Sequence, residues 1–183
     1  SNTECWTCSM CRTYNNCMRK TIIAPGEYYH ICNRAVNKQT IFQDSNDYYR
    51  FLFLILYFQS NQTFQQINRL VKEFVRHRVL DSIDINKIID RRTIELVAFC
   101  IMSNHFHLMI KEVEEGGITA YMQRILNAYA KYYNTKYEKS GHVFQGPYRA
   151  VHIVNDRQLL HASAYIHRNP REIAKWFQKE EQY

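Results

Sequence analysis

Two histidines separated by one residue are the feature of this sequence best suited to chemistry. His105 and His107 open the apolar segment HFHLMIK, with Phe106 between them. In a β-strand alternate side chains share one face, so both imidazoles would point the same way and Phe106 would point into the core. Two adjacent imidazoles can offer ring nitrogens to one metal ion. The pattern by itself also fits two partly exposed polar residues at the start of a strand.

A tyrosine and an asparagine near the C-terminus supply the second half of a possible reaction centre. Tyr165 and Asn169 are four residues apart in a predicted helix, hence on one helical face, and His161 lies one turn earlier. The asparagine oxygen and the two histidines would give Mg²⁺ or Mn²⁺ three ligands, leaving positions for phosphate oxygens and water. A tyrosine phenolate can displace a sugar oxygen from phosphorus, which leaves a covalent phosphotyrosine and a free 3′-hydroxyl. These residue types predict metal-assisted cleavage of a phosphodiester if the helix lies against the histidine strand.

The elements that position these groups follow from apolar periodicity. In chain order they are a strand at 27–34, a helix at 45–57, a hairpin at 94–112 that turns at Ser103-Asn104, a helix at 118–137, a strand within 142–154 and a helix from 156 that Pro170 ends. Caps are expected at Asp44 or Ser45 and at Asn155 or Asp156. The order β, α, β, β, α, β with an added helix predicts an α+β fold of split βαβ type, an antiparallel sheet with helices on one face.

The chain divides into a cysteine-rich leader, residues 1–24, and a single domain, residues 25–178, with a helical insertion at about 59–92. The leader contains four closely spaced cysteines that could bind Zn²⁺ as thiolates: Cys5, Cys8, Cys11 and Cys17. Structural zinc sites usually separate two cysteine pairs by a longer loop, so a flexible leader without metal is the alternative. The insertion contains one helical pattern, at 63–79.

Charge favours a polyanionic partner. The formal net charge is +7, and the segment 120–175 carries nine Lys or Arg residues against three acidic ones, interleaved with Tyr and His. Such a mixture suits phosphate contacts with base stacking. Candidate DNA contacts are Gln145, Tyr148 and Arg149 in one loop, together with Arg124, Lys131 and Arg168. The longest apolar run, 51–58, is too short to span a bilayer, and no signal-peptide pattern is visible, so we expect a cytoplasmic location.

Three strings in the chain carry a family resemblance. The motif His105-Phe106-His107 resembles the HUH signature, histidine–hydrophobic–histidine, of single-tyrosine endonucleases. The strings SNHFHLMI, YAKYYNTKYEKSGHVFQGPYRA and AYIHRNP together resemble the IS200-like transposases, especially the REP-associated tyrosine transposase branch. The likeness runs from about Tyr28 to Ile173, with the three strings in the family's order.

The resemblance implies a fold, an activity and roles for residues. The fold would be the ferredoxin-like HUH domain, and the substrate would be single-stranded DNA near a hairpin. Tyr165 would be the nucleophile that forms a 5′-phosphotyrosine, with His105, His107 and Asn169 as ligands of Mg²⁺ or Mn²⁺. Members of the family include monomers and homodimers that exchange the tyrosine helix, so either state is open. The cysteine-rich leader and the length of the insertion depart from the family pattern.

Other interpretations remain open at this stage. A non-catalytic nucleic-acid-binding module could use the same split βαβ sheet, although such modules need exposed aromatic residues where this chain has histidines. A relaxase or replication initiator often has a lysine one turn from the tyrosine, where this chain has Arg168. A zinc-binding interaction protein would depend on the leader. Among rival tyrosines, Tyr129 and Tyr133 fit the apolar face of their helix and so the core. His30 could share the face of the histidine pair, or be a structural or DNA-side polar residue.

Overall fold

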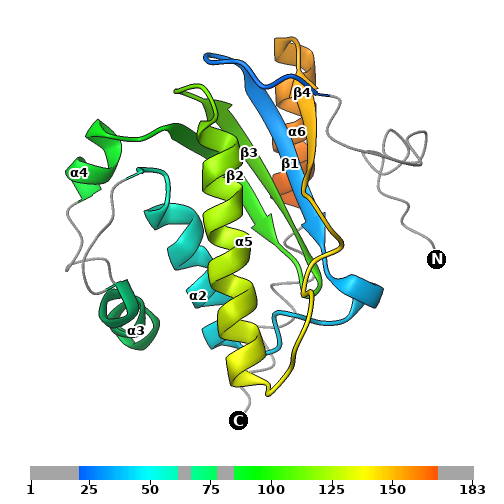
Figure 1. The fold of residues 1–183 in the computed structure, drawn as a ribbon. Coiled ribbons are helices and arrows are strands. Elements are labelled where there is room, and N and C mark those ends of the chain that lie inside the picture. The colour runs from blue at the N-terminus through cyan, green and yellow to red at the C-terminus, as the bar shows by residue number, and fades with distance from the viewer. Residues whose placement is uncertain (1–20, 62–66, 78–84, 169–183) are drawn as a thin grey trace.

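A four-stranded antiparallel sheet forms the centre of the computed structural model, which describes residues 21–61, 67–77 and 85–168 (Figure 1). The strands are β1 (Tyr28–Arg34), β2 (Ile94–Ile101), β3 (His105–Glu112) and β4 (Arg149–Ile153). Their order across the sheet is β2-β3-β1-β4, and every neighbouring pair is antiparallel. The predicted hairpin is confirmed, because β2 and β3 pair directly and the Met102 amide donates to the His105 carbonyl at 2.8 Å across the turn.

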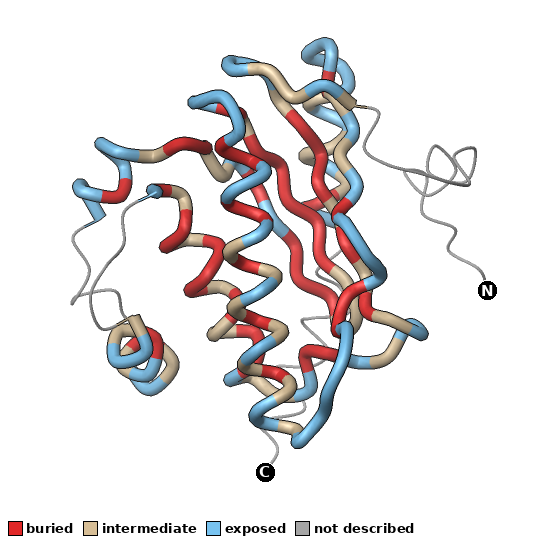
Figure 2. The backbone as a smooth tube through the Cα atoms, in the orientation of Figure 1, coloured by how far each residue is buried: buried red, intermediate tan, exposed pale blue. Residues whose placement is uncertain are grey.

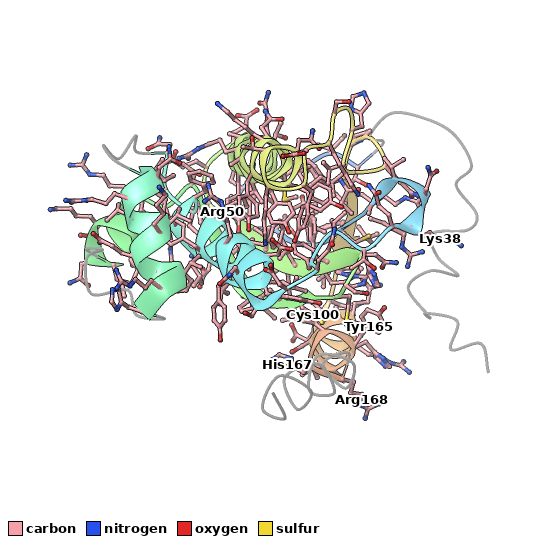
Figure 3. All side chains as sticks on the ribbon, turned by 90° about the horizontal axis from the view of Figure 1, so that it is seen from below. Lys38, Arg50, Cys100, Tyr165, His167 and Arg168 are labelled. Carbon is pink, nitrogen blue, oxygen red and sulfur yellow. The ribbon has the colours of Figure 1, made fainter. Side chains whose placement is uncertain are left out.

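Helices cover both faces of this sheet. Helices α2 (Ser45–Tyr57) and α5 (Gly117–Lys136) pack on one face, and α6 (Asp156–Arg168) packs on the other against β2, β3 and β4 (Figures 1 and 3). The smaller elements are η1 (Val36–Lys38), α3 (Ile67–His77) and α4 (Ile85–Asp90). The predicted α+β split βαβ fold is therefore confirmed. The predicted placement of helices on one face is correct for α2 and α5. The added helix, α6, instead covers the opposite face.

The main core lies between the sheet and α2 with α5, where the central strands are buried along their length (Figure 2). Strand alternation sends Ile31, Phe106 and Leu108 into this core, where all three are fully buried. Phe106 packs its ring against Phe51 of α2, at 4.9 Å between centroids. The opposite face carries a smaller apolar cluster beneath α6, made of Ala98, Cys100, Met102, Met109, Ile153 and Ile166.

Local sequence signals set the helix ends. Asp44 caps α2 in a reciprocal capping box with Asp47, as expected for one of the two proposed caps. Asn155 accepts the Gln158 amide at 2.9 Å at the start of α6. At the start of α5, Gly116 has φ 79°, and a Cβ on Gly117 would collide with the Thr93 carbonyl oxygen. The Gly-Gly pair thus permits the sharp entry into α5 that brings the helix onto the sheet.

The segment 59–92 leaves and rejoins the domain at one point. Ser60 and Arg92 form an isolated antiparallel bridge, and the Thr93 amide donates to the Gln59 carbonyl at 2.8 Å. Within the segment, α3 packs on α2 through Phe74, whose ring centroid lies 5.6 Å from that of Phe53. Because its two ends lie side by side, this segment can be inserted without disturbing the sheet. The division of the chain into a leader and one domain stays a prediction. Residues 1–20, with the four leader cysteines, lie outside the described residues.

The last strand is shorter than predicted. Only Arg149–Ile153 pairs with β1, while residues 142–148 form a loop attached by one bridge between Ala35 and Phe144. Gly146 has φ 75° within this loop, a conformation that takes the chain out of a regular ladder. The loop therefore leads into the sheet without extending it. No helix of the described segments is long and apolar enough to cross a membrane.

Candidate active site

Three histidines converge on the sheet face that α6 covers. Cys32 of β1 lies directly opposite His107 of β3, so the two side chains point to the same face of the sheet. Side chains two residues away on either strand, including His30 and His105, point to that face as well. His30 of β1 and His107 of β3 stack with ring centroids 5.1 Å apart and 13° between planes. His105 meets His107 edge to face, also at 5.1 Å. The paired imidazoles predicted from the His-x-His spacing thus share a face, and Phe106 points into the opposite core.

The amide of Asn104 determines which nitrogen of His105 holds the proton. Asn104 Nδ2 donates to the Lys38 carbonyl at 3.0 Å, which turns Oδ1 toward His105 Nδ1 at 2.7 Å. An amide oxygen only accepts, so His105 donates from Nδ1 and keeps its lone pair on Nε2. This is the tautomer in which Nε2 can bind a cation.

His30 has the corresponding position beside His107. His30 Nε2 lies 2.9 Å from His107 Nδ1, and both rings are buried. His107 Nε2 is buried, and no described residue forms a hydrogen bond with it. If His107 donates from Nδ1 to His30, its lone pair is on the unpartnered Nε2. A buried lone pair without a donor is costly unless something binds to it, and a metal ion is such a partner.

The surroundings keep all three rings neutral. Burial lowers the pKa of His30 to about 4. Burial, with a smaller effect from the Arg34 charge, lowers the pKa of His105 to about 4. Burial also lowers the pKa of His107 to about 2, helped by the charges of His30, His105 and Arg34. Neutral imidazole is the form that ligates metals, so these rings are in the ligating state near neutral pH.

Helix α6 brings Tyr165 to the same face. Ile166 is fully buried in the small cluster beneath α6, and the partly buried Leu159 and Ala162 pack with it. This apolar face fixes the rotation of the helix, so that Tyr165 lies over the histidines (Figure 3). The Tyr165 ring centroid is 5.3 Å from that of His107, at 89°, and 6.3 Å from that of His30, at 76°. The chain thus brings its own tyrosine to its own histidine pair.

A divalent metal fits the histidine pair. The donor set is two imidazoles that can both present Nε2, and the buried Nε2 of His107 lacks a partner among the described residues. Across the described ranges 21–61, 67–77 and 85–168, no group of three or more His, Cys, Asp or Glu residues is arranged to hold a metal. The predicted third ligand, Asn169, lies outside the described residues.

The three predicted DNA contacts of the loop before β4 have different environments. Arg149 is exposed and opposite Cys32, so it shares the histidine face. Gln145 is exposed in the loop, and its backbone N–H donates to the Arg34 carbonyl at 2.8 Å. Tyr148 is 4% exposed within the main core. The prediction that Tyr148 contacts DNA is therefore wrong, because its ring supports the loop from beneath.

The other predicted contacts lie away from the histidines. Arg124 of α5 packs over Phe58 at 4.3 Å and donates to the Ser60 carbonyl at 2.6 Å, so it connects α5 to the end of α2. Lys131 is exposed on α5, on the helix side of the sheet. Arg168 is exposed in the last turn of α6 and lies on the side of that helix away from the sheet (Figure 3). Contact between these three residues and DNA stays a prediction.

Sequence reasoning undervalued His30 and missed Asn104 and Arg34. Strand alternation indicates that His30 and Cys32 point to the same face of β1. The contact of His30 with His107 could not be predicted, because it depends on how β1 and β3 are aligned. Asn104 appeared only as a turn residue, and its contact with Lys38 joins distant parts of the chain. Among the rival tyrosines, Tyr129 and Tyr133 are confirmed as core residues, fully buried on α5.

Comparisons with known proteins agree with this geometry. Residues 26–169, most of the chain, match the family described as Transposase IS200 like. A solved structure of a REP-associated tyrosine transposase bound to a REP hairpin superposes with a TM-score of 0.55, at 13% sequence identity, over 85% of this chain and 73% of that one. A search of curated proteins found no match. With this family match, and with a fold shared with that transposase, the chain belongs to the IS200-like transposase family.

Proposed function

We propose that this transposase-family protein nicks and rejoins single-stranded DNA through a covalent bond to Tyr165. The observation that carries the proposal is the placement of the Tyr165 ring 5.3 Å from His107, on a buried face with two further histidines. The tyrosines of α5 and its C-cap are already engaged: Tyr121, Tyr129 and Tyr133 are buried in the core, and Tyr132 and the C-cap Tyr137 donate to Asp47. Tyr165 is thus the tyrosine whose surroundings suit phosphoryl transfer.

The proposed reaction exchanges one phosphodiester bond for another. Tyr165 gives up its phenolic proton, and its oxygen forms a bond to the phosphorus of the DNA backbone. The bond from phosphorus to the 3′-oxygen breaks, and that oxygen takes up a proton to become a free 3′-hydroxyl. The 5′-phosphate stays on the tyrosine, so attack by a 3′-hydroxyl in the reverse direction rejoins strands.

His105 and His107 would hold a divalent cation, Mg²⁺ or Mn²⁺, with Asn169 as the proposed third ligand. When bound, such a cation supplies positive charge that stabilises the phosphate and the departing oxygen. Asn104 and His30 orient the two imidazoles, and burial keeps them neutral. Arg149, on the same face, is placed to contact a backbone phosphate.

The substrate proposed is single-stranded DNA next to a hairpin. The support is the solved transposase of the same fold, which was captured with a REP hairpin. Because Tyr165 and the histidines of one chain already meet, a single chain supplies both parts of the proposed site, in a monomer or in a homodimer.

A covalent-adduct assay tests the proposal. The protein is incubated with hairpin-bearing single-stranded DNA and Mn²⁺ or Mg²⁺, and adducts are resolved on a denaturing gel. Wild type should give a metal-dependent adduct, and Tyr165→Phe should give none. Tyr28→Phe is the matched control, because Tyr28 packs against the same small cluster beneath α6 and should keep the adduct. An adduct that survives in Tyr165→Phe would show that another residue is the nucleophile.

A further inference from the structure

A positively charged side chain lies next to the histidine pair on the neighbouring strand. Arg34 is the last residue of β1, and it lies directly opposite His105 of β3. Side chains two residues apart in a strand point the same way, so Arg34 shares its face of the sheet with His30 and Cys32. Arg34 therefore projects from the histidine face. The proposed nicking chemistry does not use this side chain.

The backbone of Arg34 is fixed without using its guanidinium. The Arg34 N–H donates to Asn33 Oδ1 at 2.8 Å, and the Arg34 carbonyl accepts the Gln145 N–H at 2.8 Å. Asn33 is itself buried, and its Nδ2 donates to the Gly146 carbonyl at 3.3 Å. Together with the pairing of β1 and β3, these bonds determine where the side chain begins and leave its N–H donors for another partner.

The Arg34 guanidinium has no anion beside it. Among the described residues no carboxylate forms an ion pair with Arg34, whereas Lys136 on the core side lies 2.7 Å from Asp47. Arg34 is only partly exposed. Beyond burial, its charge is among the causes that lower the pKa of both His105 and His107, so its field reaches both imidazoles. A guanidinium in this position is suited to an anion that accepts two parallel hydrogen bonds, as a phosphate does.

Arg149 shares this face of the sheet but lies farther from the histidines. Arg149 of β4 is opposite Cys32 of β1, which places it two strands from β3, whereas Arg34 is one strand away. Neighbouring strands are about 4.8 Å apart, so the backbone of Arg149 begins about one strand spacing farther out. Arg149 can contact a phosphate elsewhere along the DNA. Arg34 is close enough to His105 for both side chains to face the same phosphate.

The position of Arg34 has a consequence for cation binding. A divalent cation at the histidine pair and the charge of Arg34 repel each other, and this repulsion is strong where water is partly excluded. A DNA phosphate is attracted by both positive charges and offsets their repulsion. Binding of the cation and binding of the phosphate then favour each other, by the same factor in both directions.

We infer that Arg34 is a further catalytic residue, which binds the phosphate that Tyr165 attacks and makes cation binding at His105 and His107 depend on that phosphate. The inference rests on the proposed function for the phosphate and the cation. During the transfer, negative charge on the phosphate oxygens is stabilised by the guanidinium beside them. Before DNA binds, the same side chain weakens the hold of the site on a cation.

The test compares three substitutions. Arg34→Gln removes the charge, and Arg34→Lys keeps the charge but loses the planar fork. Lys111→Gln is the matched control, because Lys111 points to the same face of β3 but lies opposite Tyr28, four residues or about 13 Å from His107. Mn²⁺ affinity is measured by electron paramagnetic resonance, with and without hairpin-bearing single-stranded DNA, in proteins that also carry Tyr165→Phe so that no covalent bond forms. Adduct formation is measured with Tyr165 intact.

Without DNA, Arg34→Gln should bind Mn²⁺ about three- to tenfold more tightly than the parent protein, because a repelling charge has been removed. Arg34→Lys and Lys111→Gln should bind Mn²⁺ as the parent does. DNA should improve Mn²⁺ affinity less in Arg34→Gln than in the parent. Adduct formation should fall about 10²- to 10³-fold in Arg34→Gln, less in Arg34→Lys and hardly in Lys111→Gln.

Two results would overturn the inference. If Arg34→Gln bound Mn²⁺ no more tightly than the parent without DNA, the side chain would not repel the cation and would at most support His105. If it bound Mn²⁺ more tightly but formed the adduct at the wild-type rate, Arg34 would not bind the reacting phosphate. Absence of any adduct in wild type would contradict the proposed function instead, and the Mn²⁺ affinities with and without DNA would still decide whether Arg34 couples cation to phosphate.

Discussion

The two faces of the sheet are built from the same strands yet differ in which polar groups they bury. On the face under α2 and α5, buried tyrosines reach backbone acceptors: Tyr121 donates to the Ile55 carbonyl and Tyr129 to the Ile41 carbonyl, both at 2.7 Å. On the face under α6, His107 keeps a buried Nε2 without a partner among the described residues. Arg50 Nε and Glu112 Oε1 are also buried without a partner among the described residues, so what distinguishes the second face is its group of three neutral imidazoles beside Tyr165.

The two faces also differ in how much apolar side chain they bury. The core cluster under α2 and α5 contains most of the large buried side chains, while the cluster under α6 is small and built from Ala, Cys, Met and Ile. Most of the free energy of folding should therefore come from the first face. The second face contributes less packing and can accept a polar arrangement, as functional sites commonly do. Neighbouring residues on β3 allow this difference to be measured directly.

The largest effect is expected for His107→Ala on activity. Loss of a metal ligand should reduce adduct formation about 10⁴-fold, equivalent to between about 5 and 6 kcal/mol. Stability should fall by about 1 to 3 kcal/mol, because the substitution removes an unsatisfied buried nitrogen but leaves the buried His30 Nε2 without its partner. Initial rates of adduct formation and urea unfolding measure the two quantities. A variant that unfolds as readily as a core mutant would show that the two faces are not distinct.

Substitution of the neighbouring residue, Phe106→Ala, should reduce stability strongly and activity little, the reverse of His107→Ala. Phe106 is fully buried and its ring packs against Phe51 and Phe144. Removing the ring should lower the free energy of unfolding by about 3 to 5 kcal/mol, as for other buried phenylalanines. The activity that remains per folded molecule should stay near that of wild type. Urea unfolding gives the folded fraction by which adduct rates are corrected, and an unchanged midpoint would contradict the role assigned to the core face.

Strand alternation made much of this arrangement predictable. The spacing of His105, Phe106 and His107 fixes opposite directions for neighbouring side chains whatever the rest of the fold. Helical spacing put Tyr165 and Asn169 on one face of the last helix, and the structure packs Tyr165 against the apolar cluster that contains Ile166. The α+β order of elements followed from apolar periodicity, because each element has one buried face.

What sequence could not supply was the register between distant segments. His30 stands 77 residues before His107, and only the pairing of β1 with β3 brings their rings to 2.9 Å. The β4 boundary failed for a related reason: apolar residues at 143 and 144 pack into the core from a loop, which periodicity does not separate from a strand. Tyr148 was misjudged because burial in a loop depends on what lies beneath it.

His30 offers a smaller effect that tests how the histidine face is organised. His30→Ala should weaken Mn²⁺ binding by about 10- to 100-fold, because an outer partner that fixes the tautomer of a ligand typically has this effect. Titration of Mn²⁺ followed by electron paramagnetic resonance measures affinity without DNA. His30→Gln, whose side-chain oxygen can accept from His107 Nδ1, should recover part of the loss. Equal affinity in all three proteins would show that His30 does not orient His107.

An effect of similar size to that of His30→Ala is expected on the core side, where it depends on pH. Burial alone would raise the pKa of Asp47, but hydrogen bonds from Lys136, Tyr137 and Tyr132, with one from the Gln43 amide, lower it overall. Because the folded pKa lies below the ordinary value of about 3.9, the unfolded state binds the proton first as pH falls. The contribution of Asp47 to stability is therefore full above that value and is lost as pH falls through the folded pKa.

Asp47→Asn should accordingly lower the free energy of unfolding at pH 7 by about 1.5 to 3 kcal/mol, the range for hydrogen bonds to a charged group. The difference from wild type should shrink as pH falls from about 4 through the lower folded pKa, because the unfolded state takes up the proton first and the folded state follows. Urea unfolding at pH 7, 5 and 3 measures the trend. Mn²⁺ affinity at pH 7 should be unchanged, because Asp47 lies under α5 on the face away from His107. A loss of metal affinity equal to that of His30→Ala would show that the two faces are coupled, and the separation of stability from chemistry across this sheet would then fail.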